Sequence, residues 1–172
     1  GRSDASAIAL YQFKTLSGNT AFDTSGVEPA MNLSFTGGVS WVGGCGVQFG
    51  PNSRAQASTS SSKKMHQLIT ATNEYAVEVW VAPGNVTQED AYIGSYSGGN
   101  SARNFTLGQT LYNYDALVRF SETDGNGNPA LSTPDGDEVL QATLQHVVMT
   151  FDPTNGRQLF VNGARIDVAD PE

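Results

Sequence analysis

The sequence predicts an all-β protein, a sandwich or jelly roll of antiparallel strands with one short helix. Three observations predict this class. The chain has 172 residues, of which 19 are glycine and only 15% are charged, a composition typical of loop-rich β proteins. Short β-rich runs recur with turn signals roughly every 8–12 residues. The clearest of these runs lie in residues 144–168.

Residues 144–168 predict a three-stranded antiparallel meander. Two runs rich in β-branched and apolar residues lie on either side of the turn sequence Pro153-Thr-Asn-Gly. Asn162-Gly163 then matches a two-residue type I′ turn, in which both central residues need positive φ. The third strand is expected at Ala164–Val168.

The remaining strands are expected to be short and joined by Gly- and Asn-rich turns. In the run 74–81 the three valines face one side of the strand and Trp80 faces the other. Gly43-Gly-Cys-Gly predicts a tight turn or bulge between two strands. The expected strands are Ala7–Phe13, Val39–Val42, Val47–Phe49, Glu74–Val81, Tyr92–Tyr96, Phe105–Leu107, Leu117–Phe120 and Val139–Leu140.

One helix is expected after the serine-rich loop. Ser61 or Ser62 can cap it, and Met65, Leu68 and Ile69 form one buried stripe at helical spacing. We find no repeat, low-complexity segment or linker in the sequence, so a single domain over residues 1–172 is expected.

Charge and composition argue against several classes of partner. The formal net charge is −8 and the nine Lys and Arg residues are scattered, so we expect neither nucleic acid nor an anionic membrane as partner. The sequence has no run of about 18 apolar residues, so no membrane insertion is expected. The single Cys45 rules out an intramolecular disulfide.

Several motifs follow one another in a fixed order over nearly all of the chain. They are Ala9-Leu-Tyr-Gln-Phe, Ser17-Gly-Asn-Thr with Asp23-Thr-Ser-Gly, Val39-Ser-Trp-Val, Ala71-Thr-Asn-Glu-Tyr-Ala-Val-Glu-Val-Trp-Val-Ala-Pro, Arg103-Asn-Phe-Thr-Leu-Gly, Leu144-Gln-His-Val-Val-Met-Thr and Leu159-Phe-Val-Asn-Gly. This set resembles the bacterial laminin-G-like, concanavalin A-like domain family. The resemblance implies a two-sheet antiparallel jelly roll, in a secreted or cell-surface protein, that serves as a non-catalytic module for glycan binding or adhesion.

Members of this family normally continue past the strand that corresponds to 164–168, with closing strands that pair near the first strand. Here the sequence ends at Asp170-Pro-Glu, so we expect the chain to lack those strands or to receive them from another polypeptide. An unpaired edge invites strand addition. The expected partner is a glycan or a cell-surface protein, with homo-oligomerisation or strand pairing through the open edge as a further expectation.

Two features bear on catalysis. Glu74 and Glu78 share an expected strand, but residues i and i+4 on a strand lie about 13 Å apart, whereas a retaining glycosidase needs about 5–5.5 Å. His146 has no nucleophile at a recognisable motif and is interpreted as structural. We therefore expect no enzymatic activity. The alternatives are a polysaccharide hydrolase or lyase of the same fold, and a structural assembly module.

Calcium is the cofactor that the acidic loops suggest. Asp124 and Asn126 begin an alternation of oxygen-bearing side chains typical of a calcium loop, and Asp135 falls at its twelfth place. Pro129, however, stands at the sixth place, where such a loop needs glycine. Asp23 is a second candidate ligand, since related jelly rolls hold calcium in early loops. Ordinary turn chemistry is the alternative for both loops.

The candidate ligand-binding residues are aromatic and polar and lie in the middle third of the chain. Sugars bind to an aromatic face through their apolar ring face and to amide and carboxylate groups at their rim. Core packing of the tyrosines is the alternative. The candidates are Tyr92, Tyr96, Asn100, Arg103, Tyr112 and Tyr114.

Overall fold

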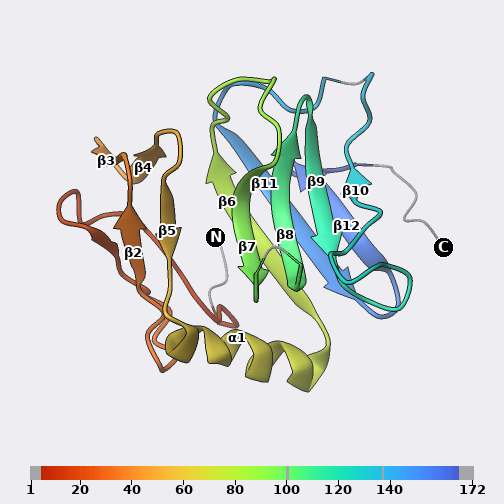
Figure 1. Cartoon of the computed structure of the whole chain (residues 1–172), viewed down its shortest axis with the longest axis horizontal. Helices are drawn as coiled ribbons and strands as arrows, with labels where there is room; N and C mark the ends of the chain where they lie inside the picture. The colour runs from red at the N-terminus through yellow and green to blue at the C-terminus, as the bar shows by residue number, and fades with distance from the viewer. Residues whose placement is uncertain (1–4, 100, 137, 167–172) are drawn as a thin grey trace. The chain divides into compact units, whose positions relative to one another are not determined.

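The computed structural model describes residues 5–99, 101–136 and 138–166 (Figure 1). The chain forms two compact units, residues 1–72 and residues 73–172. Its elements are β1 (Thr20–Ala21), β2 (Leu33–Thr36), β3 (Val39–Val42), β4 (Gly46–Phe49), β5 (Arg54–Gln56), α1 (Thr59–Thr72), β6 (Tyr75–Val81), β7 (Ala91–Ser97), β8 (Arg103–Thr110), β9 (Asn113–Val118), β10 (Leu131–Ser132), β11 (Gln145–Asp152), β12 (Gly156–Val161) and β13 (Ala164–Arg165).

The first unit holds a three-stranded sheet, β1-β2-β5, and the separate hairpin β3-β4. The hairpin confirms the turn predicted at the glycine-rich segment, where Gly44 adopts a φ of 99°. The strand expected at 7–13 is wrong. Only an isolated pairing of Tyr11 with Asp23 forms there, because Phe13 takes a φ of 50° and turns the chain out of an extended path.

Helix α1 begins earlier than the sequence suggests and buries a different residue. Ser58 is its N-cap, because its Oγ accepts the backbone N–H of Ser61 at 3.1 Å. Leu68 is exposed, whereas Lys64 is only 2% exposed. The expected apolar stripe is therefore wrong in part, since an ion pair involving Lys64 determines the buried side of the helix. No helix of the described residues is long and apolar enough to cross a membrane.

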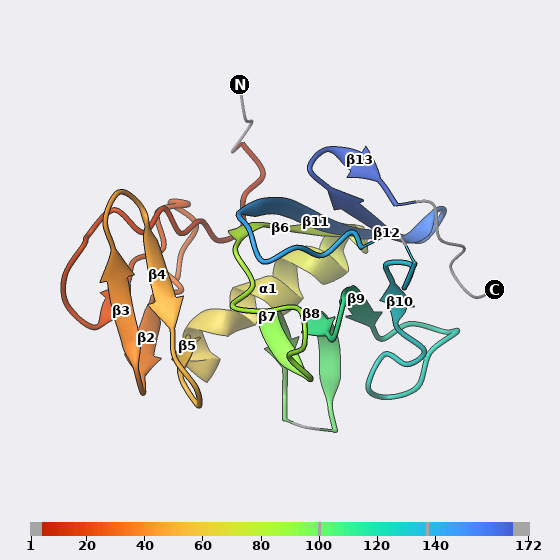
Figure 2. The same cartoon turned by 90° about the horizontal axis from the view of Figure 1, so that it is seen from above.

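The second unit is a sandwich of two four-stranded antiparallel sheets, with strand orders β10-β9-β8-β7 and β13-β12-β11-β6. Figure 2 shows the two sheets as stacked layers. Leu107 and Tyr114 from the first sheet and Met149 and Leu159 from the second are fully buried between them. Burying such side chains stabilises the unit by about 1.5–3 kcal/mol each, which explains the face-to-face packing. The predicted all-β sandwich is confirmed.

The predicted C-terminal meander is confirmed as β11-β12-β13. Asn162 and Gly163 have φ values of 52° and 82°, as a type I′ turn requires. Residues 167 and 168 of the expected third strand lie outside the described residues. The register also confirms that the valines of β6 face the core while Trp80 points outward.

Two expected strands of the second unit are placed differently. The strand expected at 117–120 lies at 113–118 as β9, and the one expected at 139–140 does not form. Leu140 is buried, but the Val139 carbonyl accepts a hydrogen bond from the Gln145 side chain at 2.9 Å instead of pairing with a strand. The short strand β10, bounded by Pro129 and Pro134, was not expected.

Candidate ligand-binding site

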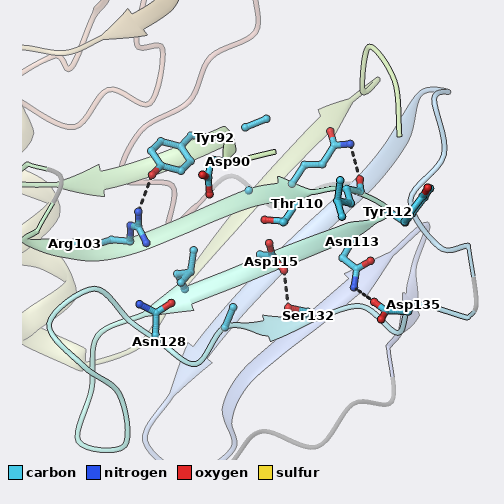
Figure 3. A pocket seen from close by; sticks show the side chains of 16 residues that line it. Asp90, Tyr92, Arg103, Thr110, Tyr112, Asn113, Asp115, Asn128, Ser132 and Asp135 are labelled. Carbon is cyan, nitrogen blue, oxygen red and sulfur yellow. Dashed lines mark hydrogen bonds between the residues drawn. The ribbon is translucent and has the colours of Figure 1, made fainter. Parts of the chain in front are cut away.

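An open pocket of about 630 Å³ lies on the β7–β10 sheet (Figure 3). Its volume is within the range of about 300–1,000 Å³ that small-molecule sites occupy. Because Tyr114 and Ala116 on β9 point into the core, the intervening Asp115 points away from it and into the pocket. The pocket therefore lies on the outward face of this sheet.

One row of side chains crosses all four strands at the centre of the pocket. Tyr92 on β7 is opposite Gly108 on β8, Gly108 is opposite Asp115 on β9, and Asp115 is opposite Ser132 on β10. Residues opposite one another in an antiparallel sheet lie on the same face. The row thus places an aromatic ring, a bare backbone, a carboxylate and a hydroxyl side by side.

Gly108 leaves the backbone of the sheet uncovered in the middle of this row. A Cβ at this position would lie 3.1 Å from the carbonyl oxygen of Ala91 and 3.9 Å from Cδ1 of Tyr92. A side chain here would press on the neighbouring strand and fill the space between Tyr92 and Asp115. The glycine therefore leaves room for a ligand to reach the sheet backbone.

Arg103 holds Tyr92 in place at one end of the pocket. Its NH2 group donates to the Tyr92 hydroxyl at 2.8 Å, and its guanidinium carbon lies 5.3 Å from the centre of the ring. Its NH1 group donates to the backbone oxygen of Asn126 at 3.2 Å. Tyr92 stays 57% exposed, so part of its ring surface is free to contact a ligand.

Asp115 is a buried carboxylate in the pocket wall. The residue is 8% exposed, and its Oδ1 accepts a hydrogen bond from the Ser132 hydroxyl at 2.5 Å. Within the ranges that the structure describes, no donor contacts its Oδ2. A carboxylate oxygen this close to the interior is a strong acceptor for a donor that enters the pocket.

Further polar groups line the other end of the pocket, where β8 turns into β9. The Asn113 side-chain amide donates to the Thr133 carbonyl and to Asp135 Oδ1, both at 2.7 Å. The exposed Tyr112 also lines this end, and Asp90 lines the pocket elsewhere. The pocket therefore offers many hydrogen-bonding groups beside two exposed aromatic rings.

Comparison with protein-family models matches residues 52–171 to the Concanavalin A-like lectin/glucanases superfamily. The chain belongs to this superfamily. The matched segment includes every residue that lines the pocket. Neither the curated proteins nor the solved structures contain a match.

In this superfamily domain three of the six predicted ligand-binding residues line the pocket: Tyr92, Arg103 and Tyr112. Tyr96 instead packs its ring 5.9 Å from that of Phe105. Asn100 lies outside the described residues.

Tyr114 belongs to the core of the domain. It is 0% exposed and donates its hydroxyl hydrogen to Gln145 Oε1 at 2.8 Å. Burial raises its pKa to about 12. The core-packing alternative thus describes Tyr114, whereas Tyr92 and Tyr112 are exposed in the pocket.

Sequence reasoning did not assign the central row of the pocket to a ligand. No motif of the sequence points to Asp115, Gly108 or Ser132 as ligand contacts. A usable signal exists in β9, where an aspartate stands between the apolar residues Tyr114 and Ala116. In a strand with one buried face, this alternation places the carboxylate on the outward face.

The calcium candidate Asp23 belongs to the first unit and is already paired. Its Oδ2 accepts from Lys64 Nζ at 2.5 Å and from the Met31 amide, and its Oδ1 accepts from the amides of Leu10 and Ser25. Burial alone would raise the pKa of Asp23, but these hydrogen bonds hold it well below its usual range. Because the Lys64 ammonium already occupies this carboxylate, the arrangement does not fit a calcium ligand.

Asp124 and Asn126, the other calcium candidates, form a polar turn. Asp124 Oδ1 accepts from the backbone amides of Asn126 at 2.7 Å and Asn128 at 2.9 Å. Hydrogen bonds from Asn128 and Asn126 lower the pKa of Asp124. Asp135 does not join this turn, since it bonds to Asn113 in the pocket. The contacts match ordinary turn chemistry, and calcium binding stays a prediction.

Glu78 and His146 lie on the sheet opposite the pocket. His146 Nε2 is 2.9 Å from Glu78 Oε1, and its ring stacks on Trp80 at a centroid distance of 4.8 Å. The two residues lie on neighbouring strands of one face. His146 thus bonds and packs within its own sheet, as its structural interpretation expects.

Proposed function

We propose that the 73–172 unit binds carbohydrate on the outward face of the β7–β10 sheet and does not cleave it. The observation that carries the proposal is the row formed by Tyr92, Gly108, Asp115 and Ser132. It joins an exposed aromatic ring to a buried hydrogen-bond acceptor across a floor that lacks a side chain.

This row suits the two-sided chemistry of a pyranose ring. The C–H face of a sugar packs on aromatic carbon, while its hydroxyls need donors and acceptors at fixed positions. Tyr92 supplies the aromatic surface, held by Arg103, and Asp115 Oδ2 supplies an acceptor. The polar groups at Asn113 and Asn128 extend the hydrogen-bonding surface to either side.

The superfamily assignment supports this class of ligand, because its description joins lectins with glucanases. Fold alone does not decide between binding and cleavage. We propose the binding role in a secreted or cell-surface protein, in which the domain serves as a module for glycan recognition or adhesion.

A glycan array followed by calorimetric titration tests the proposal. We expect Tyr92→Ala and Asp115→Asn each to weaken binding of the best glycan about tenfold or more, since each removes a contact worth about 1.4 kcal/mol or more. Trp80→Ala is the matched control, because Trp80 is 63% exposed on the opposite sheet. Absence of any glycan binding at high protein concentration would overturn the proposal.

A hydrolase is the second candidate, favoured by the three carboxylates Asp90, Asp115 and Asp135 in one pocket. Glycosidases use a pair of such groups. Turnover of a β-glucan or alginate by the wild-type protein, abolished by Asp115→Asn, would establish the enzyme. Loss of turnover in Glu78→Gln would instead place catalysis on the opposite sheet.

A further inference from the structure

Negatively charged side chains outnumber positively charged ones in the pocket. Its charged lining side chains, among the described residues, are three carboxylates and one guanidinium: Asp90, Asp115, Asp135 and Arg103. The formal charges of these side chains sum to −2, so the pocket carries an excess of negative charge. A concave site lined mainly by one sign of charge concentrates ligands of the opposite sign.

Arg103 does not neutralise the carboxylates. Its contacts are with neutral groups: the Tyr92 hydroxyl, the Tyr92 ring and the Asn126 carbonyl. Figure 3 shows Arg103 at one end of the pocket, with Asp115 near the middle and Asp135 at the other end. The described part of the chain contains no ion pair between Arg103 and any of these carboxylates.

Among the pocket carboxylates, Asp115 gains most from a further hydrogen-bond donor. It is 8% exposed, and only its Oδ1 is bonded, to Ser132. A hydrogen bond between a charged donor and a charged acceptor is roughly twice as strong as one between neutral groups. An ammonium group at Oδ2 would thus gain more than a hydroxyl at the same position.

A bound metal ion does not fit this distribution of charge. Within residues 5–99, 101–136 and 138–166, no three acidic, histidine or cysteine side chains lie close enough together to hold one. The carboxylates are instead spread along the pocket, as Figure 3 shows for Asp115 and Asp135. Spread negative charge matches a ligand that carries repeated positive groups.

We propose that the pocket selects oligosaccharides of 2-amino-2-deoxy sugars, with free amines, over neutral or acidic sugars of the same length. The inference rests on the proposed carbohydrate-binding function and specifies its ligand class. Asp115 accepts a hydrogen bond from the ammonium group of one sugar unit. Asp135 and Asp90 attract the ammonium groups of neighbouring sugar units, and Tyr92 contacts an apolar sugar face.

A matched set of three oligosaccharides tests the selection by calorimetric titration: a glucosamine tetramer, its fully N-acetylated form and a galacturonate tetramer. The first two differ only in whether the nitrogen carries a charge. We expect the free-amine tetramer to bind about tenfold or more tightly than the acetylated one, about 1.4 kcal/mol. Added salt should weaken its binding and leave that of the acetylated form nearly unchanged.

Two variants test which carboxylate causes the preference for the free amine. Asp115→Asn, which keeps the side-chain shape and the oxygen that Ser132 contacts, should reduce the preference for the free amine about tenfold. Asp135→Asn, at an exposed position, should reduce it less. Asp152→Asn is the control, because Asp152 ends β11 on the opposite sheet and accepts hydrogen bonds from the backbone amides of Thr154 and Asn155 in the turn that follows. Unfolding midpoints of all variants check that they fold.

The outcomes separate this inference from the proposed function. Equal or tighter binding of the acetylated tetramer would overturn the amine preference while supporting carbohydrate binding. Tighter binding of the galacturonate would overturn it in favour of recognition by Arg103. If neither these oligosaccharides nor any glycan on the array binds, the proposed function fails and the inference fails with it.

Discussion

Replacing Lys64 by methionine should destabilise the first unit strongly. Lys64 Nζ lies 2.5 Å from Asp23 Oδ2 and 2.6 Å from the Val27 carbonyl oxygen. The two charged side chains are 2% and 1% exposed. Methionine keeps the length and apolar character of the lysine stem but leaves the Asp23 charge buried without a counter-charge.

The size of the effect follows from this burial. Removing one partner of a buried ion pair costs about 3–5 kcal/mol. Backbone amides of Leu10, Ser25 and Met31 remain bonded to Asp23, so the lower end of that range, about 3 kcal/mol, is expected. At about 2 °C or more per kcal/mol for a chain of this length, the unfolding midpoint should fall by at least about 6 °C.

Tryptophan fluorescence can report on this unit alone. The chain has two tryptophans, so in a Trp80→Phe background the signal comes from Trp41 in β3. Lys63→Met is the control, since Lys63 is exposed on the same helix and loses the same charge. It should change stability by about 0.5 kcal/mol or less. A midpoint for Lys64→Met within about 2 °C of this control would refute the reasoning.

Three further predictions follow from the loops and the Asp23 site. Gly127→Ala should lower the unfolding midpoint by about 4 °C or more, because φ is +79° and a Cβ would lie 2.7 Å from the Val118 nitrogen; this strain exceeds about 2 kcal/mol. Gly125→Ala, with open space at its Cβ, should leave the midpoint nearly unchanged, and equal effects of the two would contradict the loop geometry. Because the native pKa of Asp23 is lowered, its stabilising contribution is complete above the unfolded pKa of about 3.9 and is lost as the pH falls toward the native value. Urea unfolding between pH 6 and pH 2 should therefore show a shallower acid loss in Asp23→Asn than in the wild type, and parallel curves would argue against the assignment. Since Lys64 occupies Asp23, Asp23→Asn should not change how the unfolding midpoint responds to excess calcium relative to EDTA, whereas loss of a calcium-dependent rise in this variant would show that Asp23 binds calcium.

The second unit was predictable because its signals are local. The Asn162-Gly163 turn and the alternation in β6 depend on neighbouring residues, and both appear in the structure as expected. The strand expected at 139–140 does not form because of a side-chain contact. Its backbone oxygen bonds to the side chain of Gln145, which no propensity reveals.

Of the candidate site, the two exposed tyrosines and Arg103 were predictable from the sequence. Tyr92 and Tyr112 could be identified from composition, but Tyr114 could not be separated from them until the strand faces were known. Register brings Gly108 beside Asp115, and their sequence separation gives no hint of that contact. The pairing of Asp23 with Lys64 could not be predicted, because the two residues lie 41 positions apart in sequence.

The most direct test of the account is a two-dimensional nitrogen–proton NMR titration of the wild-type protein with the glucosamine tetramer. The account predicts that the largest amide shifts fall on the pocket sheet, at Tyr92, Gly108 and Asp115, and saturate with a single affinity. Shifts centred on Trp80 and His146 of the opposite sheet, or none at millimolar sugar, would contradict it.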